Sequence, residues 1–255
     1  CIRDSEKQVR VIDINNRKFT ADYFLSNAAP QFVTEKIQTK PSLEGSQIKI
    51  NMLLTRLPKL KATVDNKLAF MGTFHIDESF SQLERAYDES LIGNLPTKLP
   101  SEMYCHTLTD PSILSNELQS TGYQTLTLFG MHTPASAFDE DNQSAKDEAV
   151  ARALNGLNQY LDEPIEAVLA KSKDGSYCIE AKSPLDLEAD IFLPRGNIFH
   201  RDLALPFAET DDEIGKWGVE TNFANVFICG ASAKRGGGVS GIPGHNAAMA
   251  ILEKG

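Results

Sequence analysis

The last 30 residues constrain the fold of this chain most. Residues 225–229 read Asn-Val-Phe-Ile-Cys, a short apolar run typical of a strand buried on both faces. A glycine-rich stretch follows from Gly230 to Gly244, and a helix is predicted from near Gly241 to Leu252. Glycines let the backbone turn sharply and approach a ligand, and the free N–H groups at a helix start favour an anionic or electron-rich group. The pattern is typical of a loop whose backbone contacts the edge of a cofactor.

Neither of two common phosphate-binding motifs explains this loop. Residues 236–241 satisfy G-x-G-x-x-G, but six residues intervene between the strand end at Cys229 and Gly236, and no second strand follows, so we reject a Rossmann fingerprint. No G-x-x-x-x-G-K-[ST] loop occurs either. On local chemistry alone, a packed loop without a ligand explains the glycines as well as a cofactor site does.

Strands are predicted from alternating apolar residues. Residues 9–25 alternate around a polar Asn-Asn step, which predicts a hairpin. Residues 48–54 have the period of a half-buried strand, and 70–76 are predicted as its neighbour. Two further strand-like runs cover 103–108 and 123–131. Strand runs followed by helices indicate an α+β layer with a mixed, largely antiparallel sheet covered by helices.

Two helices stand out between these strands. The first is expected to be capped by Asp77 and to end at Gly93. Its apolar positions at helical spacing are Phe80, Leu83, Tyr87 and Leu91. The second follows the acidic run 139–141, whose charges suit a helix start. Its apolar stripe comprises Val150, Ala153, Leu154, Leu157 and Leu161.

Composition excludes several classes of function. A formal net charge of -10 and a pI of about 5.0 disfavour nucleic acid as a partner. No apolar run reaches the roughly 20 residues that span a bilayer, and residues 1–7 do not resemble a secretory signal. We therefore expect no stable membrane insertion and no secretion.

Motifs for metal binding and hydrolysis are missing from the sequence. The five histidines lack H-x-H and H-E-x-x-H spacing, and the four cysteines form no C-x-x-C pair. No G-x-S-x-G elbow is present. We predict no metal site and assign no catalytic side chain.

Residues 225–248, NVFICGASAKRGGGVSGIPGHNAA, resemble the C-terminal signature of phytoene-desaturase-like FAD oxidoreductases. Further segments are similar to family segments in the same order along the chain: Ala21-Asp22 through Pro30, Asp110 to Ser112, Ser183 to Glu188, and Gly196 to His200. The Gly-Asn-Ile-Phe-His element is closest to members of unsettled substrate that occur in bacteria and mitochondria. A cytoplasmic or mitochondrial location is expected.

The resemblance implies an α/β FAD-binding domain, related to the amine-oxidase fold, combined with an α+β substrate domain. Residues 1–35 would be the middle segment of the FAD-binding domain, 36–190 the substrate domain and 191–255 the closing segment. The opening G-x-G-x-x-G unit is absent from this sequence, so a missing N-terminal segment would have to bind the FAD pyrophosphate.

The implied cofactor is FAD, bound through backbone groups of the glycine-rich loop. The implied contact residues are Gly230, Ala231, Gly236, Gly237, Gly238, Val239 and Gly241. The implied reaction is hydride transfer from a small apolar or amphipathic substrate to the flavin, with the fragment inactive and a weak FAD binder by itself. The alternative is a non-catalytic binding or interaction module. Lys234, Arg235 and Glu220 favour it, because they change the charge that relatives carry at these places.

Overall fold

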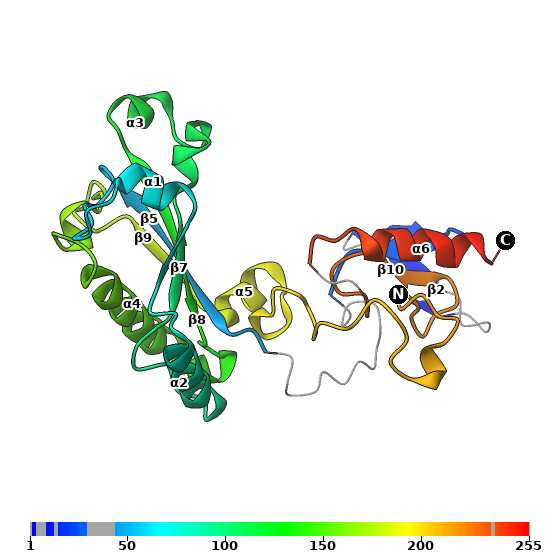
Figure 1. The fold of residues 1–255 in the computed structure, drawn as a ribbon. Helices are drawn as coiled ribbons and strands as arrows, with labels where there is room; N and C mark the ends of the chain where they lie inside the picture. Colours follow the sequence, from blue (N-terminus) through cyan, green and yellow to red (C-terminus); the bar gives the residue numbers. More distant parts are fainter. Residues whose placement is uncertain (1, 4–8, 13–14, 30–43, 236–237, 255) are drawn as a thin grey trace. The chain divides into compact units, whose positions relative to one another are not determined.

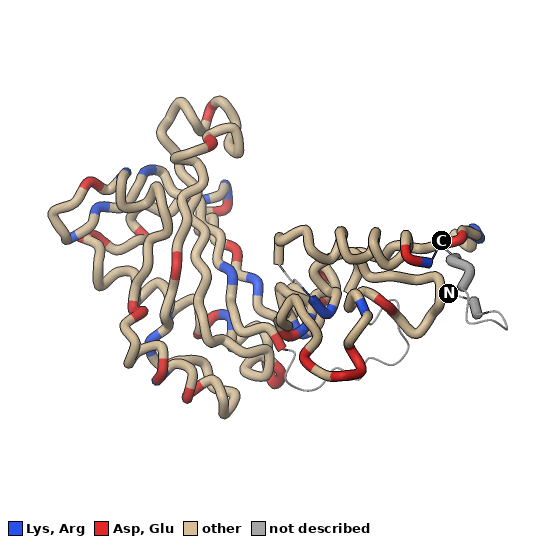
Figure 2. Tube along the Cα trace, turned by 45° about the vertical axis from the view of Figure 1, so that its right-hand side comes forward, with Lys and Arg blue, Asp and Glu red and all other residues tan. Residues whose placement is uncertain are grey.

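The computed structural model describes residues 2–3, 9–12, 15–29, 44–235 and 238–254. The chain forms two compact units: unit 1 comprises Cys1–Leu43 and Phe192–Gly255, and unit 2 comprises Glu44–Ile191. Unit 2 is therefore inserted between the two parts of unit 1 along the chain (Figure 1). Acidic and basic residues are interspersed along the traces of both units (Figure 2).

A five-stranded sheet forms the centre of unit 2, with the strand order β6-β7-β8-β5-β9 and antiparallel pairing throughout. The strands are β5 Gln47–Leu54, β6 Thr73–Ile76, β7 Ser101–Tyr104, β8 Gln124–Met131 and β9 Ile179–Lys182. Side chains of β5 alternate between buried and partly buried, as its sequence predicts. The expected α+β layer with a largely antiparallel sheet is confirmed for unit 2.

Unit 2 contains five α-helices among its described residues, of which α1 and α4 add buried residues to the core of the sheet. The helices are α1 Asn66–Met71, α2 Phe80–Leu91, α3 Asn116–Ser120, α4 Asn142–Asn158 and α5 Pro184–Ile191. Helix α4 lies along one face of the sheet (Figure 1) and buries Ala149, Ala153 and Leu157 in the same core as β5. Asp141 caps α4 by accepting a hydrogen bond from the Ser144 N–H at 3.0 Å, so the acidic run does start a helix.

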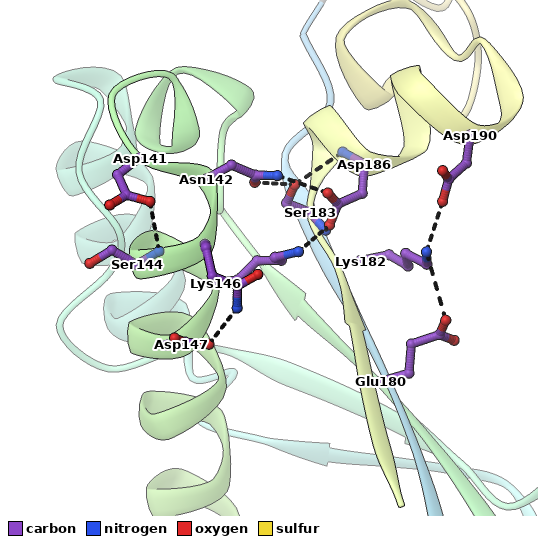
Figure 3. A network of polar contacts seen from close by, with 11 residues as sticks. Asp141, Asn142, Ser144, Lys146, Asp147, Glu180, Lys182, Ser183, Asp186 and Asp190 are labelled. Carbon is purple, nitrogen blue, oxygen red and sulfur yellow. Dashed lines mark hydrogen bonds and ion pairs between the residues drawn. The ribbon is translucent and has the colours of Figure 1, made fainter.

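A polar network joins α4 to the start of α5 (Figure 3). The Asp186 N–H donates to Ser183 Oγ at 3.1 Å, and the Ser183 N–H donates to Asp186 Oδ2 at 3.0 Å, which forms a capping box. From α4, Lys146 Nζ and Asn142 Nδ2 donate to the same carboxylate. The Ser183–Glu188 segment therefore has a structural explanation as the start of a helix.

Residues 70–76 do not form the strand beside β5. Asp65 caps α1 by accepting from the Leu68 N–H at 2.8 Å, and this helix takes in Phe70 and Met71. The strand β6 starts only at Thr73 and pairs with β7 at the sheet edge opposite β9. The neighbours of β5 are instead β8 and β9.

Helix α2 is present, but its cap and its orientation differ from those expected. Ser79, rather than Asp77, accepts from the Gln82 N–H and caps the helix. The apolar stripe faces outward, because Phe80 is 83% exposed and Leu91 is 64% exposed. Gln82 and Ala86 face inward, and Gln82 Nε2 donates to the Lys98 carbonyl at 2.9 Å.

The described residues of unit 1 form two small sheets and the helix α6. The strands β1 Ile2–Arg3, β2 Val9–Ile12 and β3 Lys18–Phe19 form an antiparallel sheet. Asn16 in the β2–β3 turn has φ of 60°, so the hairpin is confirmed for β2 and β3. The end of the expected second arm is instead the strand β4 Phe24–Ser26, which pairs in parallel with β10 Val226–Ile228. Helix α6 Ile242–Leu252 packs Ala247 and Ala250 against β10.

None of the helices formed by the described residues is long and apolar enough to cross a membrane.

Candidate cofactor site in the glycine-rich loop

Two loops lie side by side at the carboxyl ends of β4 and β10. The parallel register pairs Ser26 with Ile228, so both strands end at the same edge. The Cys229 N–H donates to the Ser26 carbonyl at 2.9 Å, and Ser232 Oγ donates to the Ala28 carbonyl at 2.8 Å. Ligands of open α/β sheets bind outside the carboxyl ends of the strands, so this edge is the candidate site.

The first half of the glycine-rich loop is packed against its own chain. An ideal Cβ on Gly230 would lie 1.5 Å from Asn27 Oδ1, so no larger residue fits unless Asn27 moves. Ser232 is fully buried, and the Ala233 N–H donates to the Gly230 carbonyl at 3.0 Å. The close approach of Asn27 therefore explains why residue 230 is a glycine. Gly230 and Ala231 remain partly exposed.

The second half of the loop is open. Gly238 and Gly241 have φ of 71° and 74°, the left-handed region that favours glycine. No atom lies within 4 Å of an ideal Cβ on Gly241, and a Cβ on Gly238 would meet only Phe199, at 3.7 Å. Val239 between them is fully exposed. Gly238, Val239 and Gly241 are therefore accessible to solvent, while Gly236 and Gly237 lie outside the described residues.

Lys234 and Arg235 turn towards the segment 213–218. Both contact the buried carboxylate of Glu213, Lys234 through Nζ and Arg235 through Nη2 at 3.7 Å. Arg235 also donates to the carbonyls of Lys216 at 2.5 Å and Glu213 at 3.0 Å. These two cations are therefore paired inside unit 1. Glu220 likewise accepts from the backbone N–H groups of Trp217 and Val219 and holds a turn.

The Gly196–His200 segment lies beside the open half of the loop, because Phe199 is the neighbour of Gly238. His200 has φ of 63°, and its buried Nδ1 has no hydrogen-bond partner among the described residues. Burial lowers the pKa of His200. The segment thus places the Phe199 ring next to Gly238.

Helix α6 begins where the open loop ends. Gly241 is its N-cap and provides no side-chain cap, and Pro243 occupies the first turn. The helix dipole favours an electron-rich group at this end, although the Ile242 N–H already donates to Ser240 Oγ and Pro243 has no N–H. His245 is engaged elsewhere, since its Nδ1 lies 3.2 Å from Asn246 Oδ1 and its ring packs edge-on against Trp217.

The candidate site is formed by backbone groups of the glycine-rich loop. Within the described part of the chain, no group of three or more His, Cys, Asp or Glu side chains is placed to hold a metal ion. The predicted residues Gly230, Ala231, Gly238, Val239 and Gly241 belong to one loop, of which only 238–241 are open. Asn27 and Phe199 could not be predicted from the sequence as neighbours of the glycines. Asn27 reaches Gly230 only through the parallel pairing of β4 with β10, and Phe199 reaches Gly238 only through the fold of unit 1.

Comparison with known proteins identifies relatives but no family. No protein-family model matches the sequence. Uncharacterized proteins of Mycobacterium tuberculosis and Mycobacterium bovis are 48% identical over 213 residues, covering 82% of this chain and 40% of the relative. The mouse pyridine nucleotide-disulfide oxidoreductase domain-containing protein 2 is 26% identical over 252 residues, covering 89% of this chain and 41% of the relative. The chain thus spans about 40% of the length of these curated relatives, and over most of its residues it is similar to a protein named for an oxidoreductase domain.

Proposed function

We propose that this chain is part of an FAD-dependent oxidoreductase and that the open backbone of residues 238–241 faces the isoalloxazine ring. The observation that carries the proposal is the exposed turn at Gly238, Val239 and Gly241 in the loop that follows β10, where both glycines have positive φ and no close neighbour would meet an added Cβ. The N-terminus of α6 adds a favourable dipole. The similarity to a protein named for a pyridine nucleotide-disulfide oxidoreductase domain supports the same class.

The bound flavin would supply the redox chemistry by accepting a hydride from the substrate. Lys234 and Arg235 are given no role in proton transfer, since both are paired with Glu213. Within the phytoene-desaturase-like group, the substrate would be a small apolar or amphipathic molecule. Unit 1 would contact the flavin, and unit 2 would contribute to the substrate site.

The alternative of a non-catalytic interaction module draws on the changed charges at Lys234, Arg235 and Glu220. These charges do not reach the open glycines, because Glu213 or backbone amides satisfy them. The open residues of the loop, Gly238, Val239 and Gly241, are not affected by these charges, so we favour the oxidoreductase.

Flavin binding by the chain itself tests the proposal. We expect FAD and FMN to bind equally weakly, with Kd above about 100 μM, because both share the flavin ring and the pyrophosphate contacts of FAD would come from a G-x-G-x-x-G unit. Hydrogen exchange at residues 238–244 should slow in millimolar FMN. Gly241→Ala should weaken the protection.

Gly175→Ala is the matched control, because Gly175 also has positive φ and open space around its Cβ but lies in unit 2. Unchanged exchange at 238–244 in FMN would contradict the proposal. Submicromolar FAD binding with no effect of FMN would instead contradict the assignment of the flavin end to this loop.

A further inference from the structure

A cavity of about 630 Å³ lies in unit 2 beside α1, whereas the glycine-rich loop belongs to unit 1. Pockets of roughly 300–1,000 Å³ with apolar walls and a few polar groups bind small molecules in many proteins. Six apolar residues form most of the walls here: Leu60, Ala62, Val64, Leu68, Ala69 and Phe74.

Hydrogen bonds and ring contacts hold the walls in place. The Leu60 N–H donates to Asn66 Oδ1 at 3.2 Å, and the Phe74 ring packs on the buried Phe70 ring with centroids 4.8 Å apart. Tyr160 lines the cavity, and its hydroxyl donates to Asp77 Oδ1 at 2.9 Å. Asp77 is 1% exposed in its side chain and also pairs with Lys98 Nζ at 2.5 Å. The cavity is therefore preformed, so a ligand need not order these walls.

Two large apolar side chains at the cavity are exposed to water. Val64 is 54% exposed and Leu68 is 73% exposed. An apolar ligand that fills the cavity would cover both, and burial of apolar surface is the main favourable contribution to such binding. The body of the ligand should therefore be a hydrocarbon chain or ring.

One polar group of the cavity offers hydrogen-bond donors to a ligand. Lys61 Nζ donates to the Gln159 carbonyl at 2.8 Å, which leaves two of its three N–H groups for another acceptor. His75 Nδ1 lies 2.6 Å from the Glu78 carboxylate and therefore carries the hydrogen of that contact, so Nε2 of the neutral ring is an acceptor. The acidic lining residue Asp65 already accepts from the Leu68 N–H at the cap of α1. A ligand headgroup that accepts hydrogen bonds and carries negative charge matches the Lys61 ammonium.

We propose that this cavity binds a monocarboxylate with an apolar body of about eight to ten carbons, its carboxylate at Lys61 and its body against Leu68 and Phe74. The proposal is independent of the flavin site, because every residue that it uses belongs to unit 2.

Isothermal titration of the full chain with sodium octanoate tests the site. We expect a Kd of about 0.1–1 mM, in line with a ligand of this size. Leu68→Gln should weaken octanoate binding at least tenfold. Lys61→Gln should weaken it about tenfold, whereas binding of 1-octanol, which lacks the carboxylate, should change less than twofold.

Two matched variants control for general effects. Leu91→Gln changes a similarly exposed leucine on α2, and Lys59→Gln removes an exposed charge two residues from Lys61. Both should bind octanoate as the parent chain does. Absence of octanoate binding at 10 mM, or equal weakening by Leu68→Gln and Leu91→Gln, would overturn the site. Equal octanoate affinity in the parent and Lys61→Gln would overturn the choice of a carboxylate.

Discussion

Gly130→Ala in β8 should overpack the core of unit 2. An ideal Cβ at Gly130 would lie 2.4 Å from Leu99 Cδ2 and 2.9 Å from Ile48 Cγ2, whereas carbon atoms pack at about 3.5–4.0 Å. Leu99 and Ile48 are 2% and 0% exposed, so neither can retreat into solvent. Overpacking of this kind costs about 1–3 kcal/mol, and two clashes place the expected cost near the upper end.

A double-mutant cycle isolates the clash. Leu99→Ala alone should cost about 2–5 kcal/mol through the cavity that it leaves. In Gly130→Ala/Leu99→Ala the added methyl group enters that cavity, so the total should fall about 1–2 kcal/mol below the sum of the single changes.

Urea denaturation followed by far-UV circular dichroism measures these free energies. Trp217 is the only tryptophan and lies in unit 1, so its fluorescence reports unit 1 separately and its midpoint should not move. A Gly130→Ala variant within about 0.5 kcal/mol of the parent, or strict additivity in the double variant, would refute the packing argument.

Three further changes have defined outcomes. Ser79→Ala should destabilise unit 2 by about 1 kcal/mol in urea titrations, because α2 loses its cap. Gly241→Val should cost about 1–2 kcal/mol in the unit 1 transition followed by Trp217 fluorescence, since φ of 74° strains a residue with a Cβ. Burial alone would raise the pKa of Asp186, but hydrogen bonds from Lys146, the Ser183 N–H and Asn142 hold it below its ordinary value, so this stabilisation is present above about pH 4 and is lost as pH falls. Lys146→Met should therefore lower the urea midpoint at pH 7 and have a smaller effect at pH 3.

Strands with one covered face could be predicted from the sequence. In β5, apolar and polar residues alternate because α4 covers one face only, so the pattern gave both the strand and its buried side. The same argument failed for α2. Helical spacing identifies an apolar stripe but does not fix which way it faces, and the bond from Gln82 to Lys98 turns the stripe of Phe80 and Leu91 outward.

Some segments that resemble the oxidoreductase family have a structural role, whereas the glycine-rich loop is the candidate site. The Asp110-Pro111-Ser112 and Ser183–Glu188 segments are explained by caps, in which Asp110 accepts from the Ser112 N–H and Ser183 shares a capping box with Asp186. The sequence predicts a site in the glycine-rich loop, and this stays a prediction. Its division into a packed and an open half could not be predicted, since Asn27 reaches Gly230 only through the parallel pairing of distant strands.

That pairing has a consequence for synthesis of the protein. Phe24 pairs with Val226, so about 200 residues must be translated between the two strands. At about 5–20 residues per second, β4 leaves the ribosome roughly 10–40 s before its partner is made. Unit 2 is continuous in sequence and is complete by residue 191. We therefore expect it to fold before β10, the partner strand of β4, has been synthesised.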